Sequence, residues 1–327
     1  MMINSNSNSN SNSNSNSNSN SNSNSNSNSN SNSKCLVLVA AYNGATTLVE
    51  QLDSILRQEK VDVNIVISLD LSCDSSFDIC TMYANKFSNV TLLPYGERFG
   101  GAGKNFYRLL KDVYIGEYDI ISFSDQDDIW PSDKIYRATQ YLSEYDCYSS
   151  NVIAFWEDGR EVLINKAQPF RRWDFLFEAA GPGCTYVFNR DFAINFQKWL
   201  IGNYARVSNN IELHDWLIYA FSRRYGYRWF IDAMPMMRYR QHANNQVGTN
   251  NNFKAAKKRI SLIKSKWYRK QVMNIAECLD LQSSAIFRFG LENGYKGNLY
   301  LLVRVNELRR RARDRLALAL FLLFNIF

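Results

Sequence analysis

Short apolar runs alternate with amphipathic helical segments through the first part of the chain. Leu48, Leu52 and Ile55 recur at helical spacing, whereas the runs that flank this helix are continuous and rich in branched side chains, as buried strands are. This alternation, with short connections, predicts an open α/β fold with a mostly parallel sheet. The predicted strands are 35–40, 63–67, 90–93 and 119–123, and the predicted helices are 48–56, 77–87 and one that opens at the glycines of 99–103 and runs to 110.

The pattern is less regular after residue 128. Periodicity there predicts further helices and short strands, with a helical and basic end to the chain. The predicted elements are a helix over 129–145, strands over 152–155, 162–165 and 229–231, a loop that enters a strand over 181–188, a helix that begins near 214, and helices from 253 onward.

The two ends of the chain differ in composition from its middle. From Asn4 to Ser33 serine and asparagine alternate without interruption, and such a tract has no apolar area to bury, so we expect it to be disordered. We therefore predict a disordered tail over 1–33, a Rossmann-like α/β domain over 34–250, and a basic helical extension over 251–327.

The extension carries the excess positive charge. Residues 254–327 contain 16 basic and 5 acidic residues, whereas the rest of the chain contains 22 and 26. Its apolar end, Leu316–Phe327, is 12 residues long, too short to cross a bilayer, and follows the basic run Arg309–Arg315. Cations beside an apolar face fit a helix lying on an anionic membrane surface. A lid packed on the domain, or a contact in a homo-oligomer, fits the same pattern, and no nucleic-acid-binding module accompanies the charge.

Polar side chains follow three of the predicted strands. Tyr42 and Asn43 follow the first, Asp70 follows the second, and Asp125 and Asp127 follow the fourth. In open α/β sheets ligands bind beyond the carboxyl ends of the strands. We therefore expect these side chains to converge on one edge of the sheet.

The third of these groups, Asp125–Asp128, has three carboxylates in four residues, which repel one another unless a cation offsets the charge. Mg²⁺ and Mn²⁺ bind through one or two carboxylates together with substrate phosphates. Alternate residues at a strand end face the same side, so Asp125 and Asp127 are expected to share the metal. An acidic loop in which Asp128 or Ser132 caps the next helix would give the same pattern.

Seven short segments between residues 35 and 248 occur in an order and spacing that is specific to one family. They are Val39–Gly44, Glu50–Leu56, Phe99–Phe106, Phe123–Trp130, Gly183–Arg190, His214–Trp216 and Tyr239–His242. Together they resemble the family 2 glycosyltransferases, most closely the rhamnosyltransferase-like members of bacterial surface polysaccharide synthesis. The resemblance implies a GT-A fold, a nucleotide-sugar donor and an inverting mechanism. One departure puts the loop shape and the nucleotide preference in question: the usual Ser-Asp-Asp-Gly-Ser is Ser68-Leu69-Asp70-Leu71-Ser72 here.

The resemblance also assigns roles on the donor side. Asp125 and Asp127 match the D-x-D motif whose carboxylates hold Mn²⁺ or Mg²⁺ on the donor diphosphate, and Asp70 matches the residue that contacts the base. Arg98 and Lys104 lie near a glycine-rich helix start and are candidates to neutralise the diphosphate. The predicted nucleotide-binding residues are Ala41, Tyr42, Asn43, Asp70, Arg98, Lys104 and Asp125.

Asp215 matches the family's general base, which takes the proton of the acceptor hydroxyl as it attacks. Taken alone, Asp215 also fits a helix cap. His242 fits either a third metal ligand or a loop histidine packed on aromatic side chains. The residues expected on the acceptor side are Cys184, Thr185, His214 and Trp216, with His214 as an orienting neighbour of the base and core packing as the alternative for Trp216.

These expectations combine into one functional hypothesis. The chain transfers a sugar from dTDP-rhamnose or a UDP-hexose to a lipid-linked glycan, at the cytoplasmic face of a membrane. Its six cysteines form no C-x-x-C pair, which fits free thiols in a reducing cytoplasm. A nucleotide-binding peripheral membrane protein without turnover is the alternative, because of the altered loop at Leu69 and Leu71.

Overall fold

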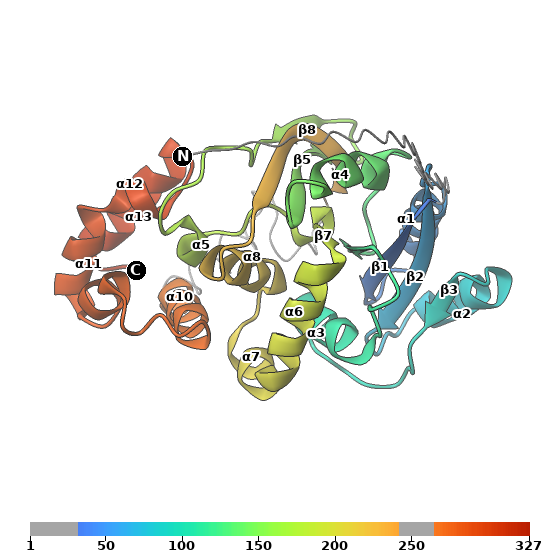
Figure 1. Ribbon diagram of the computed structural model, residues 1–327, viewed down its shortest axis with the longest axis horizontal. Helices are drawn as coiled ribbons and strands as arrows, with labels where there is room; N and C mark the ends of the chain where they lie inside the picture. The colour runs from blue at the N-terminus through green and yellow to red at the C-terminus, as the bar shows by residue number, and fades with distance from the viewer. Residues whose placement is uncertain (1–31, 242–264) are drawn as a thin grey trace, which may run out of the picture. The chain divides into compact units, whose positions relative to one another are not determined.

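The computed structural model describes residues 32–241 and 265–327 (Figure 1). Residues 1–31, which hold almost all of the Ser-Asn tract, and residues 242–264, which hold His242 and the start of the basic extension, lie outside the described residues. The described helices and strands all belong to one compact unit, Asn32–Phe327.

The predicted parallel sheet is present, with all four expected strands. They are β1 (Ser33–Ala41), β2 (Val61–Leu69), β3 (Val90–Leu92) and β4 (Ile120–Ser124), which lie in the order β3-β2-β1-β4. The connecting helices are α1 (Leu48–Leu56), α2 (Ser76–Lys86) and α3 (Ala102–Asp112). The α/β class predicted from the alternation is confirmed.

The central strand β1 is buried on both faces. Leu36 packs with Phe106 of α3 in one apolar cluster, whereas Val37 packs with Leu52 of α1 in a second cluster on the opposite face. A strand covered by helices on both sides reads as a continuous apolar run instead of an alternating one. This arrangement explains the pattern at the start of the domain, and it leaves the strand ends free to carry the polar loops.

Beyond β4 the sheet continues with strands of mixed direction. Antiparallel β7 (Val187–Asn189) joins β4 to β5 (Cys147–Phe155), which pairs with β6 (Glu161–Ile164) and with β8 (Trp229–Arg240). The prediction of a short strand at 229–231 was wrong in length, because β8 has 12 residues. The helix predicted over 129–145 is only α4 (Lys134–Leu142), because the backbone of Ile129 pairs with that of Arg238.

Three helices in this half were not predicted. α6 begins directly at the end of β7, where the Asn189 side chain accepts a hydrogen bond from the Phe192 amide at 2.9 Å. Because no loop separates strand from helix there, the change of hydrophobic period is hidden in the sequence. The helices of this half are α5 (Asp174–Phe177), α6 (Arg190–Gly202), α7 (Tyr204–Asn210) and α8 (His214–Arg224), with the 3₁₀ turn η1 (Gly183–Thr185) before β7.

The described part of the extension is helical, as predicted. It consists of α10 (Trp267–Cys278), the π-helix η2 (Ile286–Leu291), α11 (Gly294–Leu302), α12 (Val305–Leu308) and α13 (Ala312–Leu323). Its buried side chains Ile275, Phe287 and Leu318 belong to the same apolar cluster as Phe177 and Leu217 of the preceding part. Within the described ranges, no helix is both long and apolar enough to span a membrane.

The basic run before α13 is partly internal. Arg310 is 3 % exposed and pairs with Asp174 and Glu178. Arg309 donates to the Phe177 carbonyl at 2.9 Å, and Arg315 donates to the Arg310 carbonyl at 2.6 Å. These three arginines therefore pack against the domain, as the lid alternative expected, and do not form a solvated cationic surface.

Candidate active site

The loops after β1 and β4 are joined by one side chain. The Gln126 carboxamide accepts a hydrogen bond from the Tyr42 amide at 2.6 Å and donates to the Tyr42 carbonyl at 2.8 Å, as a neighbouring strand would. A Cβ at Gly44 would lie 2.5 Å from Gln126 Oε1, so a larger residue there would push the Gln126 side chain out of this pairing. The two loops therefore form one edge, as the strand-end prediction expected.

The loop after β2 secures the turn at Asn43, whose φ is +45°. The Asn43 amide donates to Ser72 Oγ at 3.0 Å, and the Asn43 side chain accepts from the Cys73 amide at 2.9 Å. Asp74 accepts from the Ala45 amide at 3.0 Å, and although burial opposes the shift, its hydrogen bonds hold its pKa below the ordinary value. Despite its altered sequence, the loop after β2 is therefore held against the loop after β1 by hydrogen bonds between the two.

Asp70 supports the glycine-rich loop before α3. Its Oδ1 accepts from the amides of Leu71 and Phe99, both at 2.8 Å, and its Oδ2 accepts from the Gly100 amide at 2.9 Å. The carboxylate is 3 % exposed. The structure thus gives Asp70 a role in shaping the loop, and a contact with a nucleotide base would use its remaining acceptor capacity.

Arg98 and Lys104 flank the start of α3 and are both exposed. Neither forms an ion pair with a residue in the described ranges, so each has its charge available for an anion. Gly103, in the first turn of α3, lies against the loop before α8: a Cβ there would be 2.0 Å from the carbonyl oxygen of Glu212. That contact seats α3 against the loop that leads into α8.

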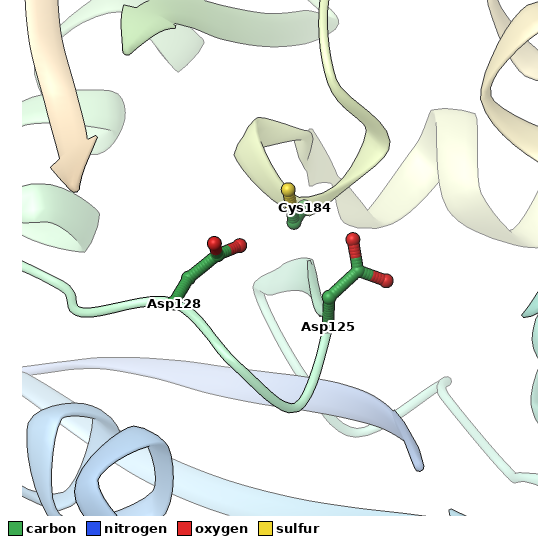
Figure 2. A group of neighbouring side chains, drawn as sticks. All are labelled: Asp125, Asp128 and Cys184. Carbon is green, nitrogen blue, oxygen red and sulfur yellow. The ribbon is translucent and has the colours of Figure 1, made fainter. Parts of the chain in front are cut away.

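The acidic loop after β4 gathers a cluster that differs from the prediction. Oxygen atoms of Asp125 and Asp128 and the sulfur of Cys184 lie within 4.8 Å of one another (Figure 2). Asp128 was not predicted as a partner of Asp125, whereas Asp127 was; the charge of Asp127 also acts on Asp125, so the predicted pair stays a prediction. The Asp127 backbone carbonyl accepts from Arg240 Nε at 2.9 Å.

Burial and mutual repulsion perturb these acids. Burial raises the pKa of Asp125, and the charge of Asp127 raises it further. The same two causes, in the same order, raise the pKa of Asp128 well above its ordinary value. Charge concentrated in this way is the electrostatic condition that a bound cation relieves.

The turn η1 brings the acceptor-side residues to this cluster. A Cβ at Gly183 would lie 2.7 Å from His214 Nε2 and 2.9 Å from Asp215 Cβ, so only glycine lets η1 pack on the start of α8. Cys184 is thereby held over the acidic loop. Thr185 is fully buried, with its hydroxyl donating to the Pro182 carbonyl at 2.7 Å.

Asp215 lies in the first turn of α8, next to this cluster. Burial raises its pKa to about 6, while the Trp216 amide, which donates to its Oδ1 at 2.8 Å, and the charge of Lys166 act in the opposite direction. A carboxylate with a pKa near 6 is matched to proton abstraction close to neutral pH. The alternative role of Asp215 as a helix cap fits less well, because Leu213 is the N-cap of α8 and Asp215 lies inside the helix.

The neighbours of Asp215 are packing residues. His214 stacks on Phe106 with ring centroids 4.0 Å apart, and burial lowers its pKa to about 3, so it is neutral. Trp216 is buried, donates from Nε1 to the Phe175 carbonyl at 3.0 Å, and stacks on Tyr268. Both position α8, and the Trp216 indole has little free surface to offer an acceptor.

Three side chains at the site escaped sequence reasoning. Gln126 lies between aspartates, and no motif indicates that its side chain pairs with the backbone of Tyr42. Lys166 follows β6 without any motif, yet its charge acts on Asp215. Lys134 is fully buried beside the acidic loop, with Nζ 3.6 Å from the Trp130 ring centroid, and burial lowers its pKa to about 8.

Comparison with known proteins identifies the family. The sequence profile of glycosyl transferase family 2 matches residues 36–200. A dTDP-rhamnosyl transferase of Shigella flexneri, RfbG, is 48 % identical over 292 residues, which cover 88 % of this chain and 100 % of that protein. The chain is a family 2 glycosyltransferase. The glycosyltransferase domain thus contains every loop described above up to α6, and the wider similarity to RfbG extends over most of the chain.

Two further proteins are similar to this glycosyltransferase, one in sequence and one in fold. The poly(ribitol-phosphate) beta-glucosyltransferase of Bacillus spizizenii is 33 % identical over 113 residues, 34 % of this chain and 17 % of that protein. The crystal structure of S. aureus TarS 1-349 matches with a TM-score of 0.50 and 16 % identity, covering 90 % of this chain and 88 % of that one. The latter similarity concerns the fold, which is of the predicted GT-A type.

Proposed function

We propose that this glycosyltransferase transfers rhamnose from dTDP-rhamnose to a lipid-linked glycan in the synthesis of a surface polysaccharide. The observation that carries the proposal is the 48 % identity to the Shigella dTDP-rhamnosyl transferase, which extends over all of that protein. Fold similarity alone does not specify a sugar. Similarity over an entire relative includes the donor side and the acceptor side, and so favours the rhamnosyl donor over a UDP-hexose.

Asp215 is the general base in this proposal. It takes the proton of the acceptor hydroxyl while the oxygen forms a bond to the anomeric carbon. The bond from that carbon to the diphosphate breaks at the same time, and dTDP leaves with the electron pair. Attack from the face opposite the leaving group inverts the anomeric configuration. A base of this kind contributes about 10²–10⁴-fold to the rate.

A divalent cation, Mn²⁺ or Mg²⁺, fits the acidic loop. Asp128 Oδ2 is buried and has no donor at ordinary hydrogen-bond distance and angle among the described residues, apart from the weak Cys184 thiol that acts on this carboxylate. Asp125 with its neighbours Asp127 and Asp128 would hold the ion, which stabilises charge on the leaving diphosphate when bound. Arg98 and Lys104 would add positive charge from the start of α3. Ala41, Tyr42 and Asn43 would line the nucleotide, as the family resemblance implies.

The exposed apolar surface of the extension suits a lipid-linked acceptor. Leu316, Leu320 and Phe324 form one stripe on and just after α13, and Phe324 is 66 % exposed. The Tyr295 hydroxyl of α11 donates to the Leu323 carbonyl at 3.2 Å, so the two helices present adjacent apolar surface. We propose that this surface lies in the interface of the cytoplasmic leaflet, where the acceptor is anchored.

A donor panel tests the proposed reaction. The purified chain is incubated with dTDP-rhamnose, UDP-hexoses and GDP-sugars, with Mn²⁺ or Mg²⁺, and release of the nucleoside diphosphate is followed with and without chelator. Asp215→Asn is compared with Asp191→Asn, a matched change in the first turn of α6, away from the site. We expect release from dTDP-rhamnose that the chelator abolishes and that only Asp215→Asn reduces. Release from a UDP-hexose alone would refute the proposed donor.

A further inference from the structure

The cluster at the acidic loop includes a thiol. Cys184 comes from η1, whereas Asp125 and Asp128 come from the loop after β4, and their potential ligand atoms lie within 4.8 Å of one another. In Figure 2 the Asp128 carboxylate extends toward Cys184, and Asp125 lies on the other side of the sulfur. Six free cysteines occur in the chain, and this is the one placed beside two carboxylates.

Asp128 is the least satisfied member of the cluster. It is 1 % exposed, and its Oδ1 accepts from the Arg240 amide at 3.2 Å. Its Oδ2 has no donor at ordinary hydrogen-bond distance and angle among the described residues, and the Cys184 thiol is a weak donor to this carboxylate. A buried carboxylate oxygen without a strong donor is costly, so Asp128 needs an electropositive partner, which is a proton or a bound cation.

The nearby lysine does not supply that partner. Lys134 Nζ donates to Ser122 Oγ at 3.4 Å and lies over the Trp130 ring, and within the described part of the chain it forms no ion pair with a carboxylate. Its charge nevertheless acts on Cys184 and Asp128 across the cluster. A divalent cation bound by the cluster would offset the charges of Asp125 and Asp128.

We infer, building on the metal-dependent transfer proposed above, that Cys184 and Asp128 join Asp125 as ligands of the divalent cation. On binding, the Cys184 thiol releases its proton to solvent and coordinates as the thiolate, as a metal-bound thiol does. Ligand atoms around a tetrahedral, zinc-sized ion are about 3.3–3.8 Å apart. The three atoms lie within 4.8 Å of one another, so closing on an ion requires a movement of up to about 1 Å, within the reach of side-chain rotation.

A sulfur ligand changes which metals the site prefers. Thiolates favour borderline metals such as Co²⁺ and Zn²⁺, whereas Mg²⁺ prefers oxygen ligands only. The site should thus bind Co²⁺ more tightly than Mg²⁺, by a margin that depends on Cys184. Removing the sulfur while keeping its size, as in Cys184→Ser, should reduce that margin.

Cobalt spectroscopy tests the ligand set without any turnover. The full chain with Cys73→Ser serves as background, because Cys73 is the exposed thiol. It is titrated with Co²⁺, and the thiolate-to-cobalt charge-transfer band and the stoichiometry are recorded. Cys278→Ser, a buried thiol on α10, is the matched control for Cys184→Ser, and Asp128→Asn tests the orphaned carboxylate. Circular dichroism checks that each variant is folded.

We expect one Co²⁺ per chain with a thiolate band that persists in Cys278→Ser and disappears in Cys184→Ser. Cys184→Ser and Asp128→Asn should each weaken Co²⁺ binding by about tenfold or more. Co²⁺ binding without a thiolate band in the background protein would overturn the sulfur ligand, even if no variant folds. If chelator-sensitive dTDP release persists in that case, only the ligand assignment fails. Turnover that needs no metal, together with no Co²⁺ binding, would refute the metal site itself.

Discussion

Arg310 fixes the C-terminal extension to the catalytic part through a buried polar cluster. Its guanidinium lies 3.6 Å from Asp174 and 3.6 Å from Glu178, and it donates to the Tyr219 hydroxyl at 3.0 Å. It also donates to the Ala179 carbonyl at 2.7 Å, in the segment that leads to η1. Arg310→Met keeps much of the aliphatic volume of the side chain but leaves both carboxylates without this cation.

The expected loss of stability depends on which partners remain. Removing one member of a buried ion pair costs about 3–5 kcal/mol, because the remaining charge stays buried. Asp174 keeps Arg223 at 2.9 Å, and Glu178 keeps Arg309 at 3.9 Å. We therefore expect the lower end, about 3 kcal/mol. At about 2–4 °C per kcal/mol for a chain of this size, the melting temperature should fall by about 6–12 °C.

Urea unfolding followed by circular dichroism measures this change, with thermal unfolding as a second observable. Arg313→Met is the matched control, because the Arg313 side chain is 77 % exposed in the same basic run. The control should change the free energy of unfolding by less than about 0.5 kcal/mol. Equal effects of the two substitutions, or a loss below about 1 kcal/mol in Arg310→Met, would show that the cluster does not hold the extension in place.

Three further predictions concern the site. Because burial raises the pKa of Asp215 to about 6, kcat/KM should fall as the pH drops through 6. Above pH 6 the buried Asp215 carboxylate is charged, which costs stability, so Asp215→Asn should raise the free energy of unfolding there. This gain in stability should vanish below about pH 4, where Asp215 is protonated in both the folded and the unfolded protein. A gain in urea unfolding that does not change with pH would contradict the raised pKa. Gln126→Glu places an acceptor against the Tyr42 carbonyl, which should cost about 1–3 kcal/mol and raise the donor KM; wild-type values for both would exclude the strand-like pairing. Gly103→Ala should cost about 1–3 kcal/mol in urea unfolding, whereas Gly202→Ala, with open space at its Cβ, should be nearly neutral; equal midpoints would refute the close approach of α3 to the loop before α8.

Much of the parallel half of the fold was predictable, because β1 and β4 are buried along nearly their whole length and the last part of β2 is buried too. Such strands appear as uninterrupted apolar runs, so β1, β2 and β4 were found within a few residues of their true ends. The second half was not. β8 runs past Pro235 as it pairs with β5, with irregular register near Asn151, and no local pattern reports a pairing between segments so distant in sequence.

The site, too, was predictable only in part. Residues at strand ends, such as Asp125 and Asp70, were found because topology alone places them on one edge. Their detailed contacts depend on side-chain direction, which the spacing rule does not describe. A loop, not a strand, follows Ser124, and it brings Asp128 as well as Asp127 close to Asp125. The close approach of Gly183 to α8, which brings Cys184 to the acids, is a tertiary contact that the sequence does not express locally.

The reaction proposed for this glycosyltransferase is the transfer of rhamnose from dTDP-rhamnose to a lipid-linked glycan. The most direct measurement supplies dTDP-[¹⁴C]rhamnose and lipid-linked glycans extracted from bacteria with rhamnose in their surface polysaccharide, and counts label in the lipid phase. We expect label with the wild-type chain and divalent metal, and a loss of about 10²–10⁴-fold in Asp215→Asn. Labelling from a UDP-hexose in place of dTDP-rhamnose, or undiminished transfer by Asp215→Asn, would contradict the account.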